Sequence, residues 1–383
     1  MRDFYEFFAG AGMVRAGLGE DWQCRFANDF DHKKSRVYRD NWGDGELKTA
    51  DVRALTTSDL PGRANLIWGS FPCQDLSLAG AGAGLKGERS GTFWPFWNLI
   101  KALIKEDRAP ELIVLENVCG TLSSHDGKDF TMICRSLHDA GYAVGAIVVD
   151  ALLFVPQSRP RLFIIGVHRS IEIPTSLIAA GSLPRWHSKA LKDAHAKLPR
   201  GIHDEWIWWN LALPRSRRVS LSDIIEKSPS GVEWFTDTET TRLIAMMSDI
   251  NLDKLDKAKR MGRPVVGGVY KRTRSDGYGR KVQRAEIRFD NVSGCLRTPA
   301  GGSSRQVILI VDGQSIRARL ISARETARLM GLHDSYKLPQ NYNEAYHLTG
   351  DGVVVPVVRH LAKYILEPIL DCAEKAKTKT IAA

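Results

Sequence analysis

The chain has 383 residues, of which 43% are hydrophobic and 26% charged, a composition typical of globular proteins and long enough for two domains. No apolar run approaches the ~20 residues of a membrane-spanning helix, and a strand-like run at the N-terminus leaves no room for a signal peptide, so we expect a cytoplasmic protein. The net charge of +10 suggests a polyanionic partner.

The cysteines and histidines show no metal-binding or disulfide pattern. The chain has no C-x-x-C pair and no clustered histidines, so we expect no metal site and no disulfide framework. The cysteines are Cys24, Cys73, Cys119, Cys134, Cys295 and Cys372.

The N-terminal stretch predicts a strand, a glycine turn and a helix. Residues 4–8 are mostly aromatic, Gly10 and Gly12 follow, and a short helical pattern comes next. Such a unit brings the backbone close to nucleotide-like ligands. A second predicted strand ends at Asp29, where a carboxylate can bind ribose hydroxyls. Equally, Asp29 or Asp31 could be the N-cap of the next helix.

A cysteine follows the next predicted strand. Residues 66–68 are apolar, and Cys73 lies between them and a glycine-rich loop. Ligands bind at this edge of an open α/β sheet. A lone cysteine is usually a small buried hydrophobic residue. Here the preceding Pro72 fixes the backbone and the position faces the loop side, which favours a nucleophile.

A carboxylate ends a further predicted strand. Residues 112–115 are apolar and lead into Glu116, and we expect this strand beside the one that precedes Cys73, in parallel order. A carboxylate there is costly unless it is paired or its pKa is raised, both of which suit a catalytic acid. The alternative is a solvated glutamate at a strand end.

Two arginines precede the apolar strand at residues 162–167. Arg159 and Arg161 are two positions apart, so we expect them on the same face. A pair of guanidinium groups suits a phosphate or a base carbonyl. The alternative is a solvated basic edge.

The alternation of strands and helices stops after residue 168. Residues 254–284 are rich in Lys, Arg and Gly, which predicts a loop-rich basic surface that contacts phosphate. The alternative is an ordinary solvated face. A turn-rich segment at 298–306 precedes a predicted hairpin at 307–320, and a capping box at Ser322 opens a short helix.

Taken in order, these motifs resemble those of the C5-cytosine-specific DNA methyltransferase family. Each is weak alone, but their order and spacing are specific, and they span nearly the whole chain outside its middle. One departure is Asp351, where the family usually has Asn. The motifs are Phe8-Ala9-Gly10-Ala11-Gly12, Pro72-Cys73-Gln74, Glu116-Asn117-Val118, Gln157-Ser158-Arg159-Pro160-Arg161, Arg324-Glu325, and Gly350-x-Gly before a Val run.

The resemblance implies an α/β fold with two domains. A Rossmann-like S-adenosylmethionine-dependent methyltransferase domain with a mostly parallel sheet is expected at residues 1–180 and 345–376. A smaller, irregular target-recognition domain is expected at residues 185–340. We expect residues 377–383 to form a disordered tail.

The resemblance also implies a mechanism. The Cys73 thiolate would attack C6 of a cytosine flipped out of the duplex. Glu116 would bind the N3 edge and amino group of the base, Arg161 would hold its O2, and Arg159 would line the pocket or contact phosphate. The activated C5 would then take a methyl group.

The resemblance further implies the residues that bind cofactor and DNA. S-adenosylmethionine would be held by Phe8, Gly10, Gly12, Asp29 at the ribose, Phe30 at the adenine, Asp51 at the adenine amino group, Pro72, Asp351 and Val353. Double-stranded DNA would be contacted by Gln74, Ser77, Arg89, Gln157, Lys271, Arg272, Arg274, Ser303, Ser304 and Arg305.

Several partners and functions remain open. We expect a monomer, with a cognate restriction endonuclease as partner if the protein belongs to a restriction–modification system. One alternative is an RNA cytosine-5 methyltransferase, whose Cys-Phe-Thr signature is absent here. Another is a non-catalytic DNA-binding relative, against which the intact Cys73, Glu116, Arg159 and Arg161 argue.

Overall fold

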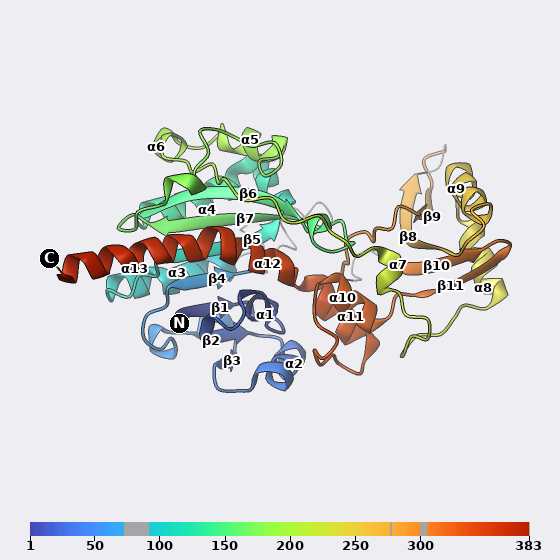
Figure 1. Ribbon diagram of the computed structural model, residues 1–383, viewed down its shortest axis with the longest axis horizontal. Coiled ribbons are helices and arrows are strands. Elements are labelled where there is room, and N and C mark those ends of the chain that lie inside the picture. The colour runs from blue at the N-terminus through green and yellow to red at the C-terminus, as the bar shows by residue number, and fades with distance from the viewer. Residues whose placement is uncertain (73–91, 276–277, 299–304, 383) are drawn as a thin grey trace. The chain divides into compact units, whose positions relative to one another are not determined.

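The computed structural model describes residues 1–72, 92–275, 278–298 and 305–382. The chain divides into two compact units, whose elements are labelled in Figure 1. Unit 1 comprises Met1–Asp150, Pro160–Pro214 and Val355–Ala383, and unit 2 comprises Ala151–Arg159 and Arg215–Val354. Along the described stretches, no helix is both long and apolar enough to cross a membrane.

Unit 1 is built on a seven-stranded sheet with the order β3-β2-β1-β4-β5-β7-β6. Strands β1 to β5 pair in parallel, whereas β7 is antiparallel to both of its neighbours. The expected mostly parallel sheet is therefore confirmed. The strands are β1 (Arg2–Phe7), β2 (Trp22–Asp29), β3 (Leu47–Thr49), β4 (Leu66–Gly69), β5 (Leu112–Val118), β6 (Tyr142–Asp150) and β7 (Pro160–His168).

The helices of unit 1 turn apolar faces towards its core. In α3, Phe96, Leu99, Ile100 and Leu103 recur at helical spacing and are buried. The helices are α1 (Met13–Leu18), α2 (His32–Trp42), α3 (Phe93–Lys105), α4 (Lys128–Asp139), α5 (Lys189–His195), α6 (Arg200–Asp204), α12 (Val355–Leu361) and α13 (Glu367–Ala382), with a π-helical turn at Ala362–Leu366 between the last two.

The C-terminal helices α12 and α13 belong to unit 1, which is therefore discontinuous in the sequence. In Figure 1 α12 and α13 are the red helices labelled beside α3 and β4. Gly17 of α1 packs so closely on α12 that a Cβ atom there would lie 2.5 Å from Cβ of Val358. Helix α13 continues through Ala382, where we expected a disordered tail. Lys377 of this helix also forms an ion pair with Glu111, with a Nζ–Oε1 distance of 2.6 Å.

The tryptophan-rich segment that contains Trp206, Trp208 and Trp209 belongs to unit 1, although we expected the second domain to begin at residue 185. Unit 2 takes up the chain at Arg215. Ile207 pairs with Gly145 of β6, and a Cβ atom on Gly145 would lie 2.3 Å from the Ile207 carbonyl oxygen. Trp206 lies in the hydrophobic core of unit 1. The segment therefore packs on β6.

Unit 2 contains a four-stranded antiparallel sheet with the order β11-β10-β8-β9. The predicted hairpin at 307–320 is confirmed, but the basic stretch forms a helix and two strands where we expected loops. The elements are α7 (Leu221–Ile224), α8 (Asp237–Ala245), α9 (Asp249–Lys259), β8 (Val265–Ser275), β9 (Lys281–Arg288), β10 (Val307–Asp312), β11 (Ser315–Leu320), α10 (Ala323–Leu329) and α11 (Tyr342–Asp351).

A buried ion pair joins β11 to α10 in unit 2. Arg319 and Glu325 are both fully buried and pair through two contacts, of 2.6 and 2.8 Å. Glu325 also completes the predicted capping box with Ser322. Because a buried charge without its partner is strongly destabilising, each of the two residues requires the other.

The close contact between α1 and α12 predicts an unusual response to a helix substitution. Replacing Gly by Ala inside a helix normally stabilises it. Gly17→Ala should instead destabilise unit 1 by about 1–3 kcal/mol through overpacking against Val358. The midpoint of thermal unfolding measures this effect. Gly45→Ala is the control, since a Cβ atom there would meet nothing within 4 Å. Equal midpoints for the two variants would contradict the packing.

Candidate active site

The turn after β1 adopts the left-handed conformation at three positions. Phe8, Gly10 and Gly12 have φ angles of 57°, 56° and 79°. Gly12 is required for packing, because a Cβ atom there would lie 2.5 Å from Nε1 of Trp42. At Gly10 a Cβ atom would meet nothing within 4 Å, so this part of the turn is open.

Asp29 holds this turn from the end of β2. Its Oδ2 accepts a hydrogen bond of 2.8 Å from the Gly10 amide, and its Oδ1 accepts one of 2.8 Å from the Asp31 amide. Asp31, and not Asp29, caps α2 by accepting from the amides of Lys33 and Lys34. Burial raises the pKa of Asp29. The carboxylate therefore fixes the backbone of the turn.

Two further predicted cofactor residues lie on the surface of unit 1. Phe30 follows Asp29 and is 66% exposed, unusual for a phenylalanine and suited to stacking on a planar ligand. The carboxylate of Asp51 accepts from the amide and guanidinium of Arg53, which lowers its pKa. The role of Asp51 at an adenine amino group stays a prediction.

A buried acid that we did not single out from the sequence lies beneath the turn. Glu6 of β1 is 1% exposed, and its Oε2 has no hydrogen-bond partner. Burial raises the pKa of Glu6 to about 8, opposed in part by Arg15 and by the amides of Val14 and Arg15 in α1. The sequence feature that could have identified Glu6 is a charged residue inside an otherwise apolar strand.

The predicted acid and one predicted arginine form an ion pair. Glu116 of β5 is 8% exposed, and its Oε1 lies 3.2 Å from Nε of Arg161 on β7. Because Glu116 is directly opposite Phe163, Arg161 is its diagonal neighbour on the same face. The alternative of a solvated strand end is therefore excluded for Glu116.

The backbone before Cys73 is tied to the strand that carries Glu116. Strands β4 and β5 are parallel neighbours, as expected. Asn117, adjacent to Glu116, donates a hydrogen bond of 3.2 Å from Nδ2 to the Phe71 carbonyl. Its Oδ1 accepts from the Val118 amide at 2.9 Å. Asn117 thus positions the chain two residues before Cys73, a role that we did not predict.

The predicted nucleophile Cys73 lies outside the described residues, and three of the other cysteines are poor candidates. Burial raises the pKa of Cys24 to about 12 and that of Cys119 to about 11. Burial also raises the pKa of Cys134 well above its usual value. These three side chains remain thiols at neutral pH, and a thiol is a weak nucleophile.

Arg159 and Gln157 take structural positions in unit 2. Arg159 precedes β7, is 2% exposed, and donates to the carbonyls of Leu296, Gly350 and Gly352 at 2.7–2.9 Å. The expectation that it shares a strand face with Arg161 is therefore wrong.

Gln157 is fully buried, where we expected a contact with DNA. It donates to the Leu329 carbonyl at 2.8 Å and accepts from the Leu296 amide at 3.0 Å. Its side chain therefore supports the interior of unit 2.

Some of the remaining predicted residues belong to the described part of the chain, and the others lie outside it. Lys271, Arg272 and Arg274 lie on β8, and Arg305 lies over the ring of Tyr342. Asp351 accepts a hydrogen bond from Thr298, and Val353 is buried. Their contacts with cofactor or DNA stay predictions. Cys73, Gln74, Ser77, Arg89, Ser303 and Ser304 lie outside the described residues.

Comparison with known proteins identifies the family. A family model described as C-5 cytosine-specific DNA methylase matches residues 2–367. The chain belongs to this family. The match covers both units and each of the motifs named above.

Individual methylases of known sequence and structure resemble the chain throughout its length. It is 25% identical over 372 residues to Type II methyltransferase M.BsuFI of Bacillus subtilis, covering 96% of this chain and 73% of that protein. It is 25% identical over 389 residues to M.HpaII of Haemophilus parainfluenzae, covering 96% and 89%. The crystal structure of the S. pombe Dnmt2 methyltransferase superposes with a TM-score of 0.60 at 17% identity, covering 96% and 98%. This last likeness supports the fold.

Membership of the C-5 cytosine-specific DNA methylases implies S-adenosylmethionine as cofactor. The residues of unit 1 fit this group, because an open glycine turn, a carboxylate that fixes it and an exposed aromatic ring occur together at the ends of β1 and β2. In the described residues, no three His, Cys, Asp or Glu side chains could hold a metal ion.

Glu6 should make the stability of this methylase depend on pH. The carboxyl has a pKa of about 8 in the folded protein and about 4.5 when unfolded, so the folded protein binds one more proton between these values. Its contribution to stability is therefore present below pH 4.5 and is lost as pH rises through 8. Glu6→Gln, which mimics the protonated acid, should become progressively more stable than wild type as pH rises across this window.

Chemical denaturation at several pH values would measure this difference. Glu20→Gln is the matched control, because Glu20 is exposed. If the stability difference between Glu6→Gln and wild type did not change with pH, Glu6 would not be protonated in the folded protein.

Proposed function

We propose that the protein is a DNA (cytosine-5-)-methyltransferase. It transfers methyl from S-adenosylmethionine to C5 of a cytosine flipped out of a short recognition sequence, through a covalent bond between Cys73 and C6. The observation that carries this proposal is the buried pair of Glu116 and Arg161. Glu116 lies on β5, which is the neighbour of β4, the strand that leads into Pro72-Cys73. Family membership supports the choice of base and of ring position.

The site residues have distinct parts in this reaction. Attack by the Cys73 thiolate on C6 moves an electron pair towards N3, where Glu116 in its protonated form donates a hydrogen bond to the developing negative charge. The bound cofactor supplies an electrophilic methyl group to C5. A base then removes the C5 proton, and the electron pair of that C–H bond re-forms the ring double bond as Cys73 leaves.

Arg161 is suited to orient both Glu116 and the cytosine ring. Its Nε faces Glu116 at 3.2 Å, and the planar guanidinium carries further N–H groups that can bind the O2 of cytosine. The ion pair keeps both side chains in a fixed mutual geometry. Such preorganisation is a large part of electrostatic catalysis.

Double-stranded DNA is the substrate that the relatives favour, since those reported above are named Type II methyltransferases. This name also supports a cognate restriction endonuclease as partner. RNA methylation is the second candidate, and the absence of a Cys-Phe-Thr signature argues against it. Methyl transfer to RNA exceeding that to DNA would decide for this candidate.

The test of the reaction is transfer of labelled methyl from S-adenosylmethionine to mixed-sequence duplex DNA. Wild type should place label at C5 of cytosine, and Cys73→Ser should place none. Mapping the labelled sites would give the recognition sequence. The control is that Cys73→Ser still binds DNA. Label transfer by Cys73→Ser at the wild-type rate would rule out the covalent route.

Arg161→Ala should lower kcat by about 10²–10³-fold, the usual effect of removing one donor that stabilises developing charge. Its affinity for S-adenosylmethionine should stay close to that of wild type. Arg161→Lys keeps the charge but loses the planar fork, so partial recovery of kcat is expected. Equal losses in turnover and in cofactor affinity would contradict the assigned role.

A further inference from the structure

The glycine turn after β1 depends on neighbouring residues for its conformation. Residues 9–12 are alanines and glycines, so none of their side chains can form a hydrogen bond. Phe8 is left-handed, with a φ angle of 57°, which is unfavourable for a residue that has a Cβ atom. Such a conformation persists only where the surrounding structure imposes it. The groups that bind the backbone of the turn therefore determine its shape.

Strand β2 fixes the first half of the turn. The Ala9 amide donates a hydrogen bond of 2.9 Å to the Asn28 carbonyl. The Gly10 amide donates one of 2.8 Å to Asp29. Both contacts come from the end of β2, the strand that pairs with β1.

Trp42, the last residue of α2, contacts the second half of the turn. Its Nε1 donates a hydrogen bond of 3.1 Å to the Ala11 carbonyl. Gly12 lies against the same side chain, because a Cβ atom there would be 2.5 Å from Nε1 and 2.8 Å from Cδ1 of Trp42. The indole ring therefore both binds the turn and sets its distance from α2.

Helix α2 is linked to the predicted cofactor residues at both of its ends. At the N-terminal end the amide of its N-cap, Asp31, donates to Oδ1 of Asp29 at 2.8 Å. At the C-terminal end Trp42 binds Ala11. The 11 residues between these contacts form a continuous helix. Helix α2 thus connects the half of the turn held by Asp29 with the half held by Trp42.

Arg15 of α1 fixes the orientation of the Trp42 ring. Its guanidinium carbon lies 5.1 Å from the ring centroid, which is within the range of a cation–π interaction. Nη1 of Arg15 also donates to the Tyr38 hydroxyl at 3.1 Å and to Oε2 of Glu46 at 3.2 Å. Rotation of the indole ring would therefore break its contact with an anchored guanidinium as well as its bond to the turn.

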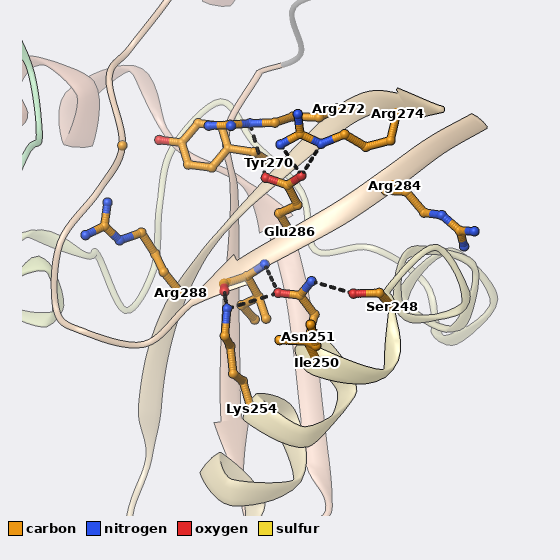
Figure 2. A pocket seen from close by; sticks show the side chains of 12 residues that line it. Ser248, Ile250, Asn251, Lys254, Tyr270, Arg272, Arg274, Arg284, Glu286 and Arg288 are labelled. Atoms are coloured by element: carbon orange, nitrogen blue, oxygen red, sulfur yellow. Dashed lines mark hydrogen bonds and ion pairs between the residues drawn. The ribbon is translucent and has the colours of Figure 1, made fainter. Parts of the chain in front are cut away.

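A similar arrangement in unit 2 shows what is particular to Trp42. There the guanidinium carbon of Arg272 lies 5.8 Å from the ring centroid of Tyr270, and its Nε lies 3.4 Å from Glu286 (Figure 2). The Tyr270 hydroxyl donates to the side chain of Gln306. In unit 1 the ring that contacts the arginine donates instead to the backbone of the predicted cofactor turn.

We propose that Trp42 is a positioning residue that holds the glycine turn in the conformation that accepts S-adenosylmethionine, and that Arg15 acts through Trp42. The identity of the cofactor rests on the proposed function. Without the bond from Trp42, a smaller fraction of molecules has the turn in the competent conformation. The apparent Kd rises in inverse proportion to this fraction, whereas the turnover of the loaded enzyme does not change.

The first test measures the affinity of the full chain for S-adenosylmethionine by calorimetry, without DNA. Trp42→Phe keeps an aromatic ring and loses the N–H group. Its Kd should be about fivefold higher than that of wild type, the usual contribution of one hydrogen bond. Its kcat at saturating cofactor should be unchanged. A Kd equal to that of wild type would overturn the inference.

Trp22→Phe is the matched control. Nε1 of Trp22 donates to Glu367 at 3.0 Å, so this variant also loses one indole hydrogen bond from unit 1. Trp22 begins β2, whereas the glycine turn lies beside the end of that strand. Trp22→Phe should lower the midpoint of thermal unfolding about as much as Trp42→Phe and leave the Kd unchanged. Equal increases in Kd for the two variants would rule out a positioning role.

Amide hydrogen exchange gives a readout that needs no cofactor. The Gly12 amide donates a hydrogen bond of 2.8 Å to the Ala9 carbonyl within the turn. Trp42→Phe should accelerate exchange of this amide severalfold, because it favours opening of the turn, and Trp22→Phe should not. Exchange at the wild-type rate in Trp42→Phe would contradict the proposal.

Arg15→Gln tests whether Arg15 acts through the ring. This variant should raise the Kd in the wild-type background and have no further effect in a Trp42→Ala background. Arg317→Gln is its control, because the Arg317 guanidinium carbon lies 4.4 Å from the ring centroid of Trp234 in unit 2. This control should leave the Kd unchanged. Additive effects of Arg15→Gln and Trp42→Ala would overturn the part assigned to Arg15.

Binding by wild type separates failure of this inference from failure of the proposed function. A wild-type protein that does not bind S-adenosylmethionine would overturn the proposed function, and this inference with it. Binding by wild type and by Trp42→Phe with the same Kd would overturn the inference alone.

Discussion

The proposed active site of this protein depends on the ion pair between Glu116 and Arg161. A carboxylate that is 8% exposed at the end of a strand is unfavourable unless a cation balances it. The cation comes from β7, which runs antiparallel to β5 and so brings its first residues beside the last residues of that strand. A parallel β7 would place Arg161 at the opposite edge of the sheet. The antiparallel direction of β7 therefore brings Arg161 next to Glu116.

Local sequence patterns were enough to predict the elements that carry the site. The glycine turn after β1, the adjacent strands β4 and β5, and the capping box at Ser322 all depend on residues close together in the chain. Each follows from the period of apolar residues, from a left-handed glycine or from a cap. Asp29 and Glu116 were likewise found at strand ends.

The sequence could not predict positions that depend on distant segments. Arg159 looks like a surface cation beside Arg161, but it is buried by carbonyl groups that lie between residues 296 and 352. We did not predict strands β8 and β9 in the basic stretch. Arginines on one face of these strands interrupt the alternation of apolar and polar residues that identifies a strand. In the same way, only the fit of Ile207 against Gly145 shows that the tryptophan-rich segment covers β6.

The packing of α12 against α1 has a consequence for biosynthesis. Gly17 is translated before unit 2, and its partner Val358 is translated after it. Domains usually fold in order as the chain leaves the ribosome. Here α1 cannot pack on α12 until unit 2 has been synthesised. Until then the nascent chain leaves the surface of α1 around Gly17 uncovered.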